Sequence, residues 1–450
     1  MAAAAVTGFV AAVVAVPGPA AGQAAEEAPW PMAGRDATHS GTAAGPIPPY
    51  REAWRRDVGL GGPVAGPVVG GGAVIVIDAQ GVAALDPETG EILWSAPRSE
   101  GSAGAPAIAG DVVIHSSGTG DSATMVARAV DDGRERWRAY LSSPATGGVV
   151  VDGGIVYVAT RDGILFGFDV RSGEQRLRFA SRGAANGTPA VAGGLVLAGW
   201  NDRPSGISTV RAVPVDSGLD ERAPQWEVSG RPSAVTAAAV AARGQVAFVA
   251  LGDGTVRAVG LEAGEERWQD RLRDAPSGDQ VPAAGESLVV ADRLHVARLD
   301  PATGEERWAY LLADLRSLGD GRFNTLARSA PAVVGDAVLI GDATGVLSAV
   351  DLTSGHRVWR ADLGHGAVSP PAADAERVYV TTLGPDGDVV ALEHNPEGRR
   401  IDQVSSTVLS PLRAVLNFLA AFVLASVLIL GIFRYALPGR RAPRPEEGGG

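Results

Sequence analysis

The sequence predicts an all-β fold, an eight-bladed β-propeller with four-stranded antiparallel blades, closed by an N-terminal strand and followed by one C-terminal transmembrane α-helix. Three observations predict it: a recurring turn-and-Trp phrase, the spacing of that phrase at 40 to 51 residues, and an apolar run of 20 residues near the C-terminus. The chain has 450 residues, and one closed ring of blades can use most of that length.

Composition agrees with a folded, turn-rich protein made of short strands, since the chain has 60 Gly, 30 Pro, 46% hydrophobic and only 20% charged residues. The net charge of −12 opposes nucleic-acid binding, because such binding requires Lys and Arg to neutralise phosphates. The chain has no Cys, which excludes thiol catalysis, thiolate metal sites, disulfides and a lipid-modified N-terminal cysteine.

The N-terminal residues 1–25 resemble a signal peptide, with an apolar Ala/Val-rich run followed by small residues. They lack the basic residues with which such peptides begin, so either the true start lies upstream or the export signal is atypical. A disordered Ala-rich tail is the alternative. Residues 26–49 are predicted to be an N-terminal extension that precedes a propeller spanning residues 50–396.

The apolar run Ala414–Phe433 carries no charge, and 20 helical residues span about 30 Å, the hydrocarbon thickness of a bilayer. It predicts a transmembrane helix at 414–433, after a juxtamembrane linker at 397–413 and before a cytoplasmic tail at 434–450. The basic residues flanking the helix give only a weak orientation signal. The export-like N-terminus therefore places the propeller on the extracytoplasmic side of the cytoplasmic membrane, which the chain crosses once.

The recurring phrase is AALDPETGEILW, ARLDPATGEERW and SAVDLTSGHRVW in its three fullest copies. Alternating residues before the Asp indicate a strand, the Asp begins a tight turn, and the Gly takes the positive φ that the turn requires. The second strand carries a large aromatic residue, which is expected to pack against the next blade. The predicted turn residues are Asp86, Gly90, Asp300, Gly304, Asp351 and Gly355.

Blade-docking residues recur once per repeat, and the predicted structural set is Trp54, Trp94, Trp137, Trp226, Trp268, Trp308 and Trp359. Leu177 takes the place of the Trp in one repeat. The segment after Trp359 has three predicted strands without a terminal Trp, whereas Trp54 lies on a terminal strand without three strands before it. Joining these two fragments gives the eighth blade and closes the ring without an exposed edge.

The phrase resembles the tryptophan-docking motif of the quinoprotein, or PQQ-like, propellers, and WPMAGRDATHSG (Trp30–Gly41) resembles the start of many family members. The resemblance covers about residues 30–395. It implies the propeller fold but leaves function open, because the family contains quinone-dependent alcohol and glucose dehydrogenases as well as a non-catalytic, BamB-like branch.

The resemblance implies specific features for the dehydrogenases: adjacent cysteines on the quinone, a set of calcium ligands and an Asp base. No Cys exists here and no ligand set can be placed, and the six His residues are dispersed. We therefore predict a protein that is not an enzyme, with no catalytic residues, no cofactor and no metal site.

The leading hypothesis is a membrane-anchored extracytoplasmic scaffold that binds a protein or cell-envelope ligand. Loops on a rigid frame commonly carry binding, so the candidate contacts are the two longest insertions, Asn201–Gly206 and Leu311–Asn324. The alternatives are a quinone-dependent dehydrogenase-like enzyme and an extracellular sensor that works through a partner.

Overall fold

The computed structural model describes residues 30–398, apart from gaps at 59–64, 79, 100, 102–103, 120–122, 203, 220–222, 234–237, 274–286, 293, 313–328, 365 and 385–386. The predicted signal-like segment 1–25, the transmembrane segment 414–433 and the tail 434–450 lie outside the described residues, as does nearly all of the linker 397–413. Within the described part of the chain, no helix combines the length and apolar character needed to cross a bilayer.

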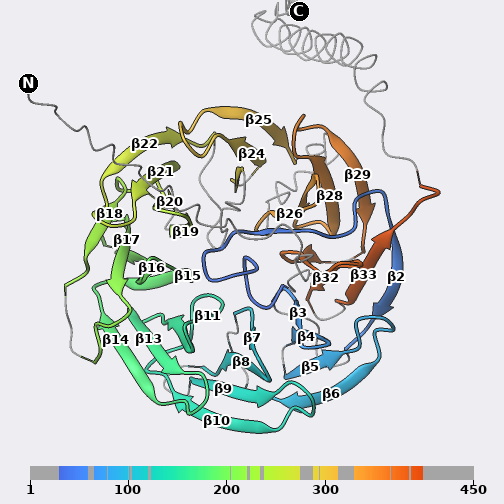
Figure 1. Cartoon of the computed structure of the whole chain (residues 1–450), viewed down its shortest axis with the longest axis horizontal. Helices are drawn as coiled ribbons and strands as arrows, with labels where there is room; N and C mark the ends of the chain where they lie inside the picture. Colours follow the sequence, from blue (N-terminus) through green and yellow to red (C-terminus); the bar gives the residue numbers. More distant parts are fainter. Residues whose placement is uncertain are drawn as a thin grey trace, which may run out of the picture.

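The described strands form eight sheets arranged around a ring (Figure 1). This confirms the predicted eight-bladed propeller. Blade 1 consists of β3 (Val68–Gly70), β4 (Ala73–Ile77), β5 (Gly81–Leu85) and β6 (Ile92–Pro97). Blade 2 consists of β7 (Ala107–Ala109), β8 (Val112–Ser117), β9 (Thr124–Ala129) and β10 (Glu135–Tyr140). Blade 3 consists of β11 (Val150–Asp152), β12 (Ile155–Ala159), β13 (Ile164–Asp169) and β14 (Gln175–Ala180).

The other half of the ring follows the same order. Blade 4 consists of β15 (Ala184–Ala192), β16 (Leu195–Asp202), β17 (Ile207–Pro214) and β18 (Trp226–Ser229). Blade 5 consists of β19 (Ala238–Arg243), β20 (Val246–Leu251), β21 (Thr255–Gly260) and β22 (Glu266–Arg271). The described strands of blade 6 are β23 (Leu288–Ala291), β24 (His295–Leu299) and β25 (Glu306–Leu311). Blade 7 consists of β26 (Ala332–Val334), β27 (Ala337–Gly341), β28 (Val346–Asp351) and β29 (Arg357–Asp362), with β1 (Thr42–Ala43) parallel to β26.

Blade 8 combines the two ends of the propeller. Its inner strands are β30 (Ala367–Val368), β31 (Ala372–Ala373), β32 (Arg377–Leu383) and β33 (Val389–His394), and its outer strand is β2 (Tyr50–Arg56). Strand β2 is antiparallel to β33, with Tyr50 opposite His394 and Trp54 opposite Ala391 (Figure 1). The N-terminal strand therefore closes the ring as the sequence predicts.

The core lies between neighbouring sheets, because both faces of each sheet are covered by another blade. The middle strands are accordingly apolar on both faces, and β4 and β5 of blade 1 are buried along their whole length. One core cluster joins Ile75, Ile77 and Trp94 of blade 1 to Ile108 and Val113 of blade 2. Outer strands alternate instead, since one of their faces meets solvent.

A β-bulge precedes the docking residue in several outer strands, a feature that the sequence analysis does not predict. In blade 2 the register shifts between Glu135 and Trp137, and in blade 8 it shifts between Glu52 and Trp54. A bulge adds a residue and increases the local twist. It thereby turns the Trp toward the next blade.

The two rims of the ring carry different connections. One rim carries the loops that join one blade to the next and the turns between the second and third strands of each blade; we call it the inter-blade rim. The other rim carries the turns between the first and second strands and between the third and fourth strands; we call it the hairpin rim. The described chain leaves blade 8 at the hairpin rim, where the Asn395 N–H donates to the Pro49 carbonyl at 2.8 Å.

Candidate functional site

The predicted docking Trp residues lie at the boundaries between blades. In six of them the indole Nε1–H donates to a backbone carbonyl in the turn between the third and fourth strands of the following blade. The pairs are Trp54 to Pro87 (3.0 Å), Trp94 to Val130 (2.6 Å), Trp137 to Val170 (2.7 Å), Trp226 to Leu261 (2.8 Å), Trp268 to Pro301 (3.0 Å) and Trp308 to Leu352 (2.9 Å). Each indole thus satisfies its own donor while its ring packs at a blade boundary, buried or, for Trp268 and Trp308, partly buried.

The predicted turn residues shape the surface on which these indoles pack. Asp86 Oδ1 accepts hydrogen bonds from the backbone N–H of Glu88 and of Thr89, at 2.9 and 2.8 Å. These bonds lower the pKa of Asp86. Gly90 has φ +69°, and a Cβ added there would lie 2.6 Å from the Trp54 ring. Only Gly gives both the backbone conformation and the clearance.

The same turn geometry recurs at the other predicted residues. Asp300 and Asp351 accept backbone hydrogen bonds within their own turns. Gly304 and Gly355 lie beneath the rings of Trp268 and Trp308. The repeated phrase therefore encodes both parts of a blade boundary: the indole and the turn on which the indole of the preceding blade packs.

The boundary between blades 3 and 4 differs, because Leu177 stands where the other blades have a Trp. Trp200, on β16 of blade 4, fills this boundary from the opposite side, and its Nε1–H donates to the Gly163 carbonyl of blade 3 at 2.9 Å. Its ring meets Phe179 edge-on with ring centroids 5.7 Å apart, and the Arg211 guanidinium lies 5.5 Å from its centroid. The sequence analysis missed Trp200, since it lies outside the repeated phrase.

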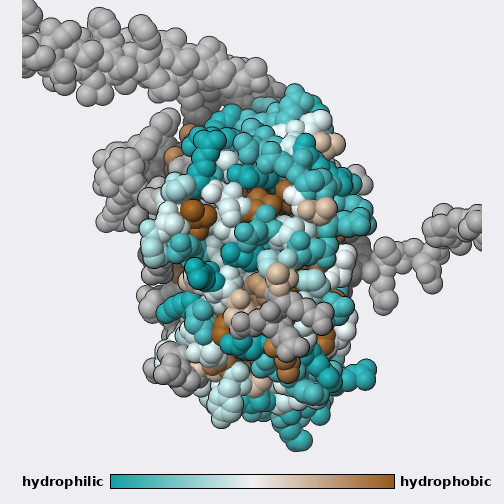
Figure 2. All heavy atoms as spheres, turned by 90° about the vertical axis from the view of Figure 1, so that its left-hand side faces the viewer, coloured by the Kyte–Doolittle hydropathy of each residue, from teal (hydrophilic) through white to brown (hydrophobic). Residues whose placement is uncertain are grey.

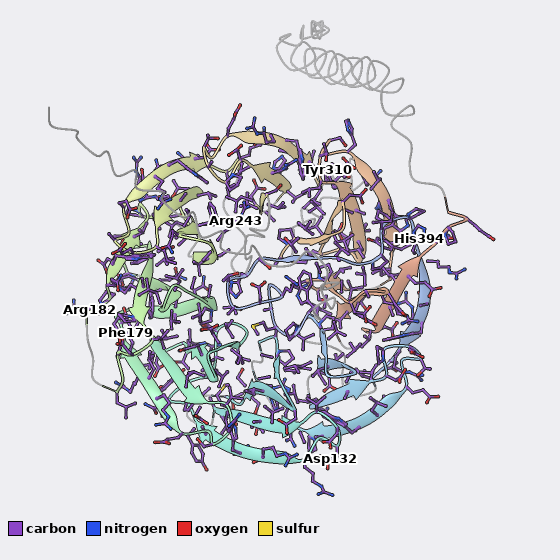
Figure 3. The ribbon with its side chains drawn as sticks, in the orientation of Figure 1. Asp132, Phe179, Arg182, Arg243, Tyr310 and His394 are labelled. Carbon is purple, nitrogen blue, oxygen red and sulfur yellow. The ribbon has the colours of Figure 1, made fainter. Side chains whose placement is uncertain are left out.

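Trp359 also has a different environment, because the next turn belongs to the blade where the chain ends meet. Its ring packs edge-on against Tyr50, with centroids 5.0 Å apart. The Tyr50 hydroxyl donates to the Pro46 carbonyl at 2.9 Å. Nearby, His394 Nδ1 donates to the Ile47 carbonyl at 2.7 Å (Figure 3). Residues before β2 thus supply the contacts that a turn supplies elsewhere.

The central channel of the ring is crossed by residues Trp30–Ala43, which we call the central segment (Figure 1). Its carbonyl oxygens accept hydrogen bonds from inner-strand N–H groups of blades 1, 2, 4, 5 and 7. The donor and acceptor pairs are Val69 to Trp30 (2.8 Å), Ile108 to Pro31 (2.7 Å), Val191 to Ala37 (2.6 Å), Ala242 to Thr38 (2.8 Å), Val333 to Gly41 (2.7 Å) and Gly335 to Ala43 (3.0 Å).

The central segment is held in shape by its own side chains. Asp36 accepts hydrogen bonds from the backbone N–H groups of Thr38 and Ser40, at 3.1 and 3.0 Å. Gly34 has φ +68°, and an added Cβ would lie 2.9 Å from His39 Cβ. His39 is fully buried, and its Nδ1 donates to the Val240 carbonyl at 2.8 Å. Burial lowers the pKa of His39, so the ring is neutral.

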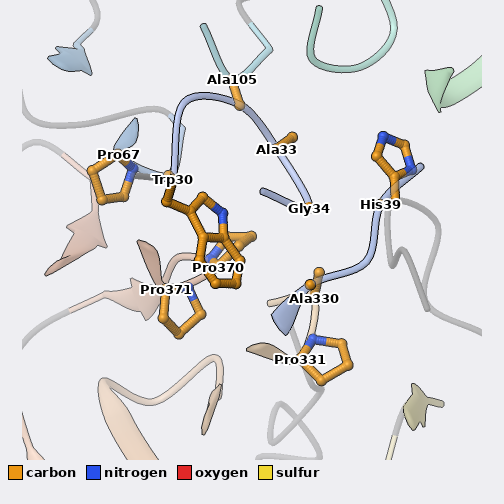
Figure 4. Close-up of a pocket in the computed structure, with 12 residues that line it drawn as sticks. Trp30, Ala33, Gly34, His39, Pro67, Ala105, Ala330, Pro331, Pro370 and Pro371 are labelled. Carbon is orange, nitrogen blue, oxygen red and sulfur yellow. The ribbon is translucent and has the colours of Figure 1, made fainter. Parts of the chain in front are cut away.

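A small cavity remains beside the central segment, with a volume of about 50 Å³. Figure 4 shows Trp30 beside Pro370 and Pro371 on one side of the cavity and His39 on the other. The remaining lining residues are small or apolar: Ala33, Gly34, Gly41, Gly66, Pro67, Ala105, Ala330 and Pro331. Such a space holds one or two water molecules, whereas pockets for larger ligands measure roughly 300–1,000 Å³.

The lining of this cavity does not fit a tricyclic quinone with a calcium ion. The cavity is too small for three fused rings, and its lining residues include no carboxylate or side-chain amide that could bind calcium. Among the described residues, no group of three or more His, Asp or Glu side chains could hold a metal ion.

A second buried histidine lies between blades 1 and 2. His115 is fully buried, and its Nε2 has no hydrogen-bond partner among the described residues. Burial, with a smaller contribution from the Arg128 guanidinium, lowers the pKa of His115 to about 3. The neutral imidazole is therefore part of the core.

The first predicted contact loop lies on the inter-blade rim. In the Asn201–Gly206 loop, the Ser205 hydroxyl donates to the Asp202 carboxylate at 2.6 Å, and Asp202 is exposed. Of the Leu311–Asn324 loop, only Leu311 and Leu312 belong to the described residues, and Leu311 is 49% exposed. The flank at the left of Figure 1 is mostly hydrophilic, with small separate apolar patches (Figure 2).

Solved structures of low sequence identity share this fold. BamB from Moraxella catarrhalis has a TM-score of 0.58 at 19% identity, and the match covers 78% of this chain and all (100%) of that one. Quinohemoprotein alcohol dehydrogenase from Comamonas testosteroni has a TM-score of 0.63 at 14% identity, over 84% of this chain and 82% of that one. Since an enzyme and a BamB protein match equally well, the fold does not decide the function.

Sequence comparisons identify the family. BamB of Burkholderia pseudomallei is 25% identical over 366 residues, covering 76% of this chain and 88% of the relative. BamB of Alkalilimnicola ehrlichii is 30% identical over 149 residues, which span only 35% of that relative. The family model described as outer membrane protein assembly factor BamB matches residues 50–140, 121–294 and 292–430. The chain therefore belongs to the PQQ-like propeller family of the outer membrane protein assembly factor BamB.

Proposed function

We propose that this protein is a non-catalytic, protein-binding scaffold of the cell envelope. The observation that carries this proposal is the central segment, which fills the channel and leaves a cavity of only about 50 Å³. This cavity is too small for a ligand of more than a few atoms, which favours binding of a partner on the rims or the flanks. The relatives named as outer membrane protein assembly factors support a protein as the ligand.

We further propose that residues 414–433 anchor the scaffold in the cytoplasmic membrane, with the propeller of residues 50–396 on the extracytoplasmic side. The described chain leaves the ring at the hairpin rim, which is thus the rim nearer to the proposed anchor.

The inter-blade rim is then the surface that is open to a partner. It carries Asp202 in the first predicted contact loop, and it carries Tyr140 at the end of β10, whose side chain is 79% exposed. An exposed Tyr supplies a large contact area at a low entropy cost. We propose that the partner binds on this rim.

Photo-cross-linking in the producing cell tests the proposal with the full chain. A photoreactive residue is placed at Tyr140 or Asp202 on the inter-blade rim and, as a matched control, at Glu88 or Glu305 on the hairpin rim. All four positions are exposed or at exposed turns. The proposal predicts one common cross-linked protein from the first pair only. Cross-links confined to the hairpin rim, or none at any position, would contradict it.

The enzymatic alternative has its own test. The purified full chain is incubated with pyrroloquinoline quinone, calcium and an alcohol, and reduction of an electron-accepting dye is followed. The filled channel predicts no quinone spectrum bound to the protein and no dye reduction. Dye reduction that requires the chain would contradict the scaffold proposal and would support a dehydrogenase function.

A further inference from the structure

The central segment links blades that do not touch one another. In a ring of repeats each blade packs on its two neighbours, so its stability depends mainly on its own strands and on two interfaces. The central segment instead binds blades 1 and 2 through Trp30 and Pro31, blades 4 and 5 through Ala37 and Thr38, and blade 7 near its end. Distant blades are therefore joined directly.

These links are backbone hydrogen bonds to inner-strand residues that are buried while the segment is in place. The donors belong to inner strands, and Val69, Val191 and Val333 are buried. Buried N–H groups left without a partner cost about 1–3 kcal/mol each. Loss of the central segment would therefore leave N–H groups without a protein partner on several blades at once and lower the stability of each.

The conformation of the central segment is fixed between the residues that bind blades 1 and 2 and those that bind blades 4 and 5. Asp36 binds Thr38 and Ser40, and His39 is fixed by its bond to the Val240 carbonyl of blade 5. Gly34 approaches His39 so closely that a methyl group would not fit. A change at Gly34 is therefore expected to disturb the segment at both blade pairs.

We propose that the central segment makes the five blades that it joins one cooperative unit, so that inner strands on opposite sides of the ring open together. This inference is independent of the proposed function. It predicts that the inner-strand N–H groups bonded to the segment share one opening free energy, although blade 1 is not a neighbour of blades 4 and 5 in the ring.

Hydrogen exchange of the full chain in detergent tests the inference. The amides followed are Val69 on blade 1, Val191 on blade 4 and Ala242 on blade 5. The variant Gly34→Ala places a methyl group at a positive φ and against His39, and it is expected to accelerate all three by a similar factor, on the order of tenfold.

The matched control is Gly72→Ala. Gly72 also has a positive φ, +77°, but no atom lies within 4 Å of an added Cβ. It lies in the first turn of blade 1, so its local effect is expected at Val69. Faster exchange confined to blade 1 in both variants would overturn the inference.

A milder variant covers the case in which Gly34→Ala does not fold. His39→Ala removes the hydrogen bond to the Val240 carbonyl on blade 5. Cooperativity predicts faster exchange at Val69 on blade 1 as well as at Ala242. A change at Ala242 alone would show that each blade is attached independently, and would also overturn the inference.

Discussion

The Trp54 indole donates a hydrogen bond of 3.0 Å to the Pro87 carbonyl oxygen, which joins the strand that closes blade 8 to a turn of blade 1. The Tyr379 ring of blade 8 lies 6.0 Å from the Trp54 ring, and its hydroxyl donates to Asp374 at 2.7 Å. Closure therefore uses the same indole and turn as the other boundaries, although the two strands come from opposite ends of the propeller.

The substitution Trp54→Phe tests the closing hydrogen bond. Phe keeps most of the buried ring but leaves the Pro87 carbonyl without the indole donor, so we expect a loss of about 1 kcal/mol in the free energy of unfolding. Chemical denaturation of the full chain measures it. Trp94→Phe is the control, because it removes the corresponding bond to Val130 between blades 1 and 2. A loss in the control without one in Trp54→Phe would show that the bond to Pro87 does not stabilise the boundary between blades 8 and 1.

The glycine beneath the indole is expected to be irreplaceable for two separate reasons. Gly90→Ala adds a Cβ at φ +69° and within 2.6 Å of the Trp54 ring. Gly110→Ala, at φ +62° with no atom within 4 Å of an added Cβ, adds only the backbone cost of about 1–2 kcal/mol. Gly90→Ala should lower the melting temperature more than Gly110→Ala. Equal effects would mean that the indole moves aside freely.

The reversed boundary between blades 3 and 4 predicts an unusual response. Trp200→Ala should cost about 3–5 kcal/mol, because it empties a buried site and frees the Gly163 carbonyl. Leu177→Trp restores the repeated phrase, yet it should destabilise the protein by about 1–3 kcal/mol, since Leu177 is already buried. Thermal unfolding of both variants checks this. A stabilised Leu177→Trp would contradict the account.

Acid should weaken the fold partly through His115. Its pKa is about 3 in the folded state and near 6.5 when unfolded, so between these values the unfolded state binds more protons. The resulting stability is fully present above pH 6.5 and is lost as the pH falls toward 3, by up to about 1.4 kcal/mol per pH unit. The free energy of unfolding, measured by denaturation from pH 7 to 4, should fall less steeply with falling pH for His115→Gln than for His356→Gln. His356 is exposed and serves as the control. Equal slopes would remove His115 as the cause.

The repeated phrase predicts the blades well, because it places a turn and a docking aromatic at a regular spacing. Trp54 and the strands after Trp359 likewise predict closure, since each fragment lacks what the other has. These features are local patterns, and they recur often enough to be recognised in one sequence.

Features that depend on contacts across the ring are not visible in the repeat. The sequence predicts only an N-terminal extension at 26–49, whereas backbone carbonyls of residues 30–43 accept hydrogen bonds from five blades. Backbone acceptors carry no residue signature, and in the sequence of the segment only turn-forming residues such as Gly34 and Asp36 indicate a fixed conformation. Trp200 escaped notice for a related reason, because it fills its boundary from the neighbouring blade.

The central claim is that the N-terminal strand closes the ring, and an engineered disulfide tests it most directly. Arg51 and Glu393 are cross-strand partners on β2 and β33, and their side chains are 2.7 Å apart. Since the natural chain has no Cys, Arg51→Cys with Glu393→Cys introduces one defined pair. The control pair is Thr209→Cys with Ser229→Cys, on adjacent strands of blade 4. The account predicts an intramolecular disulfide in both proteins under mild oxidation; a disulfide in the control alone would contradict it.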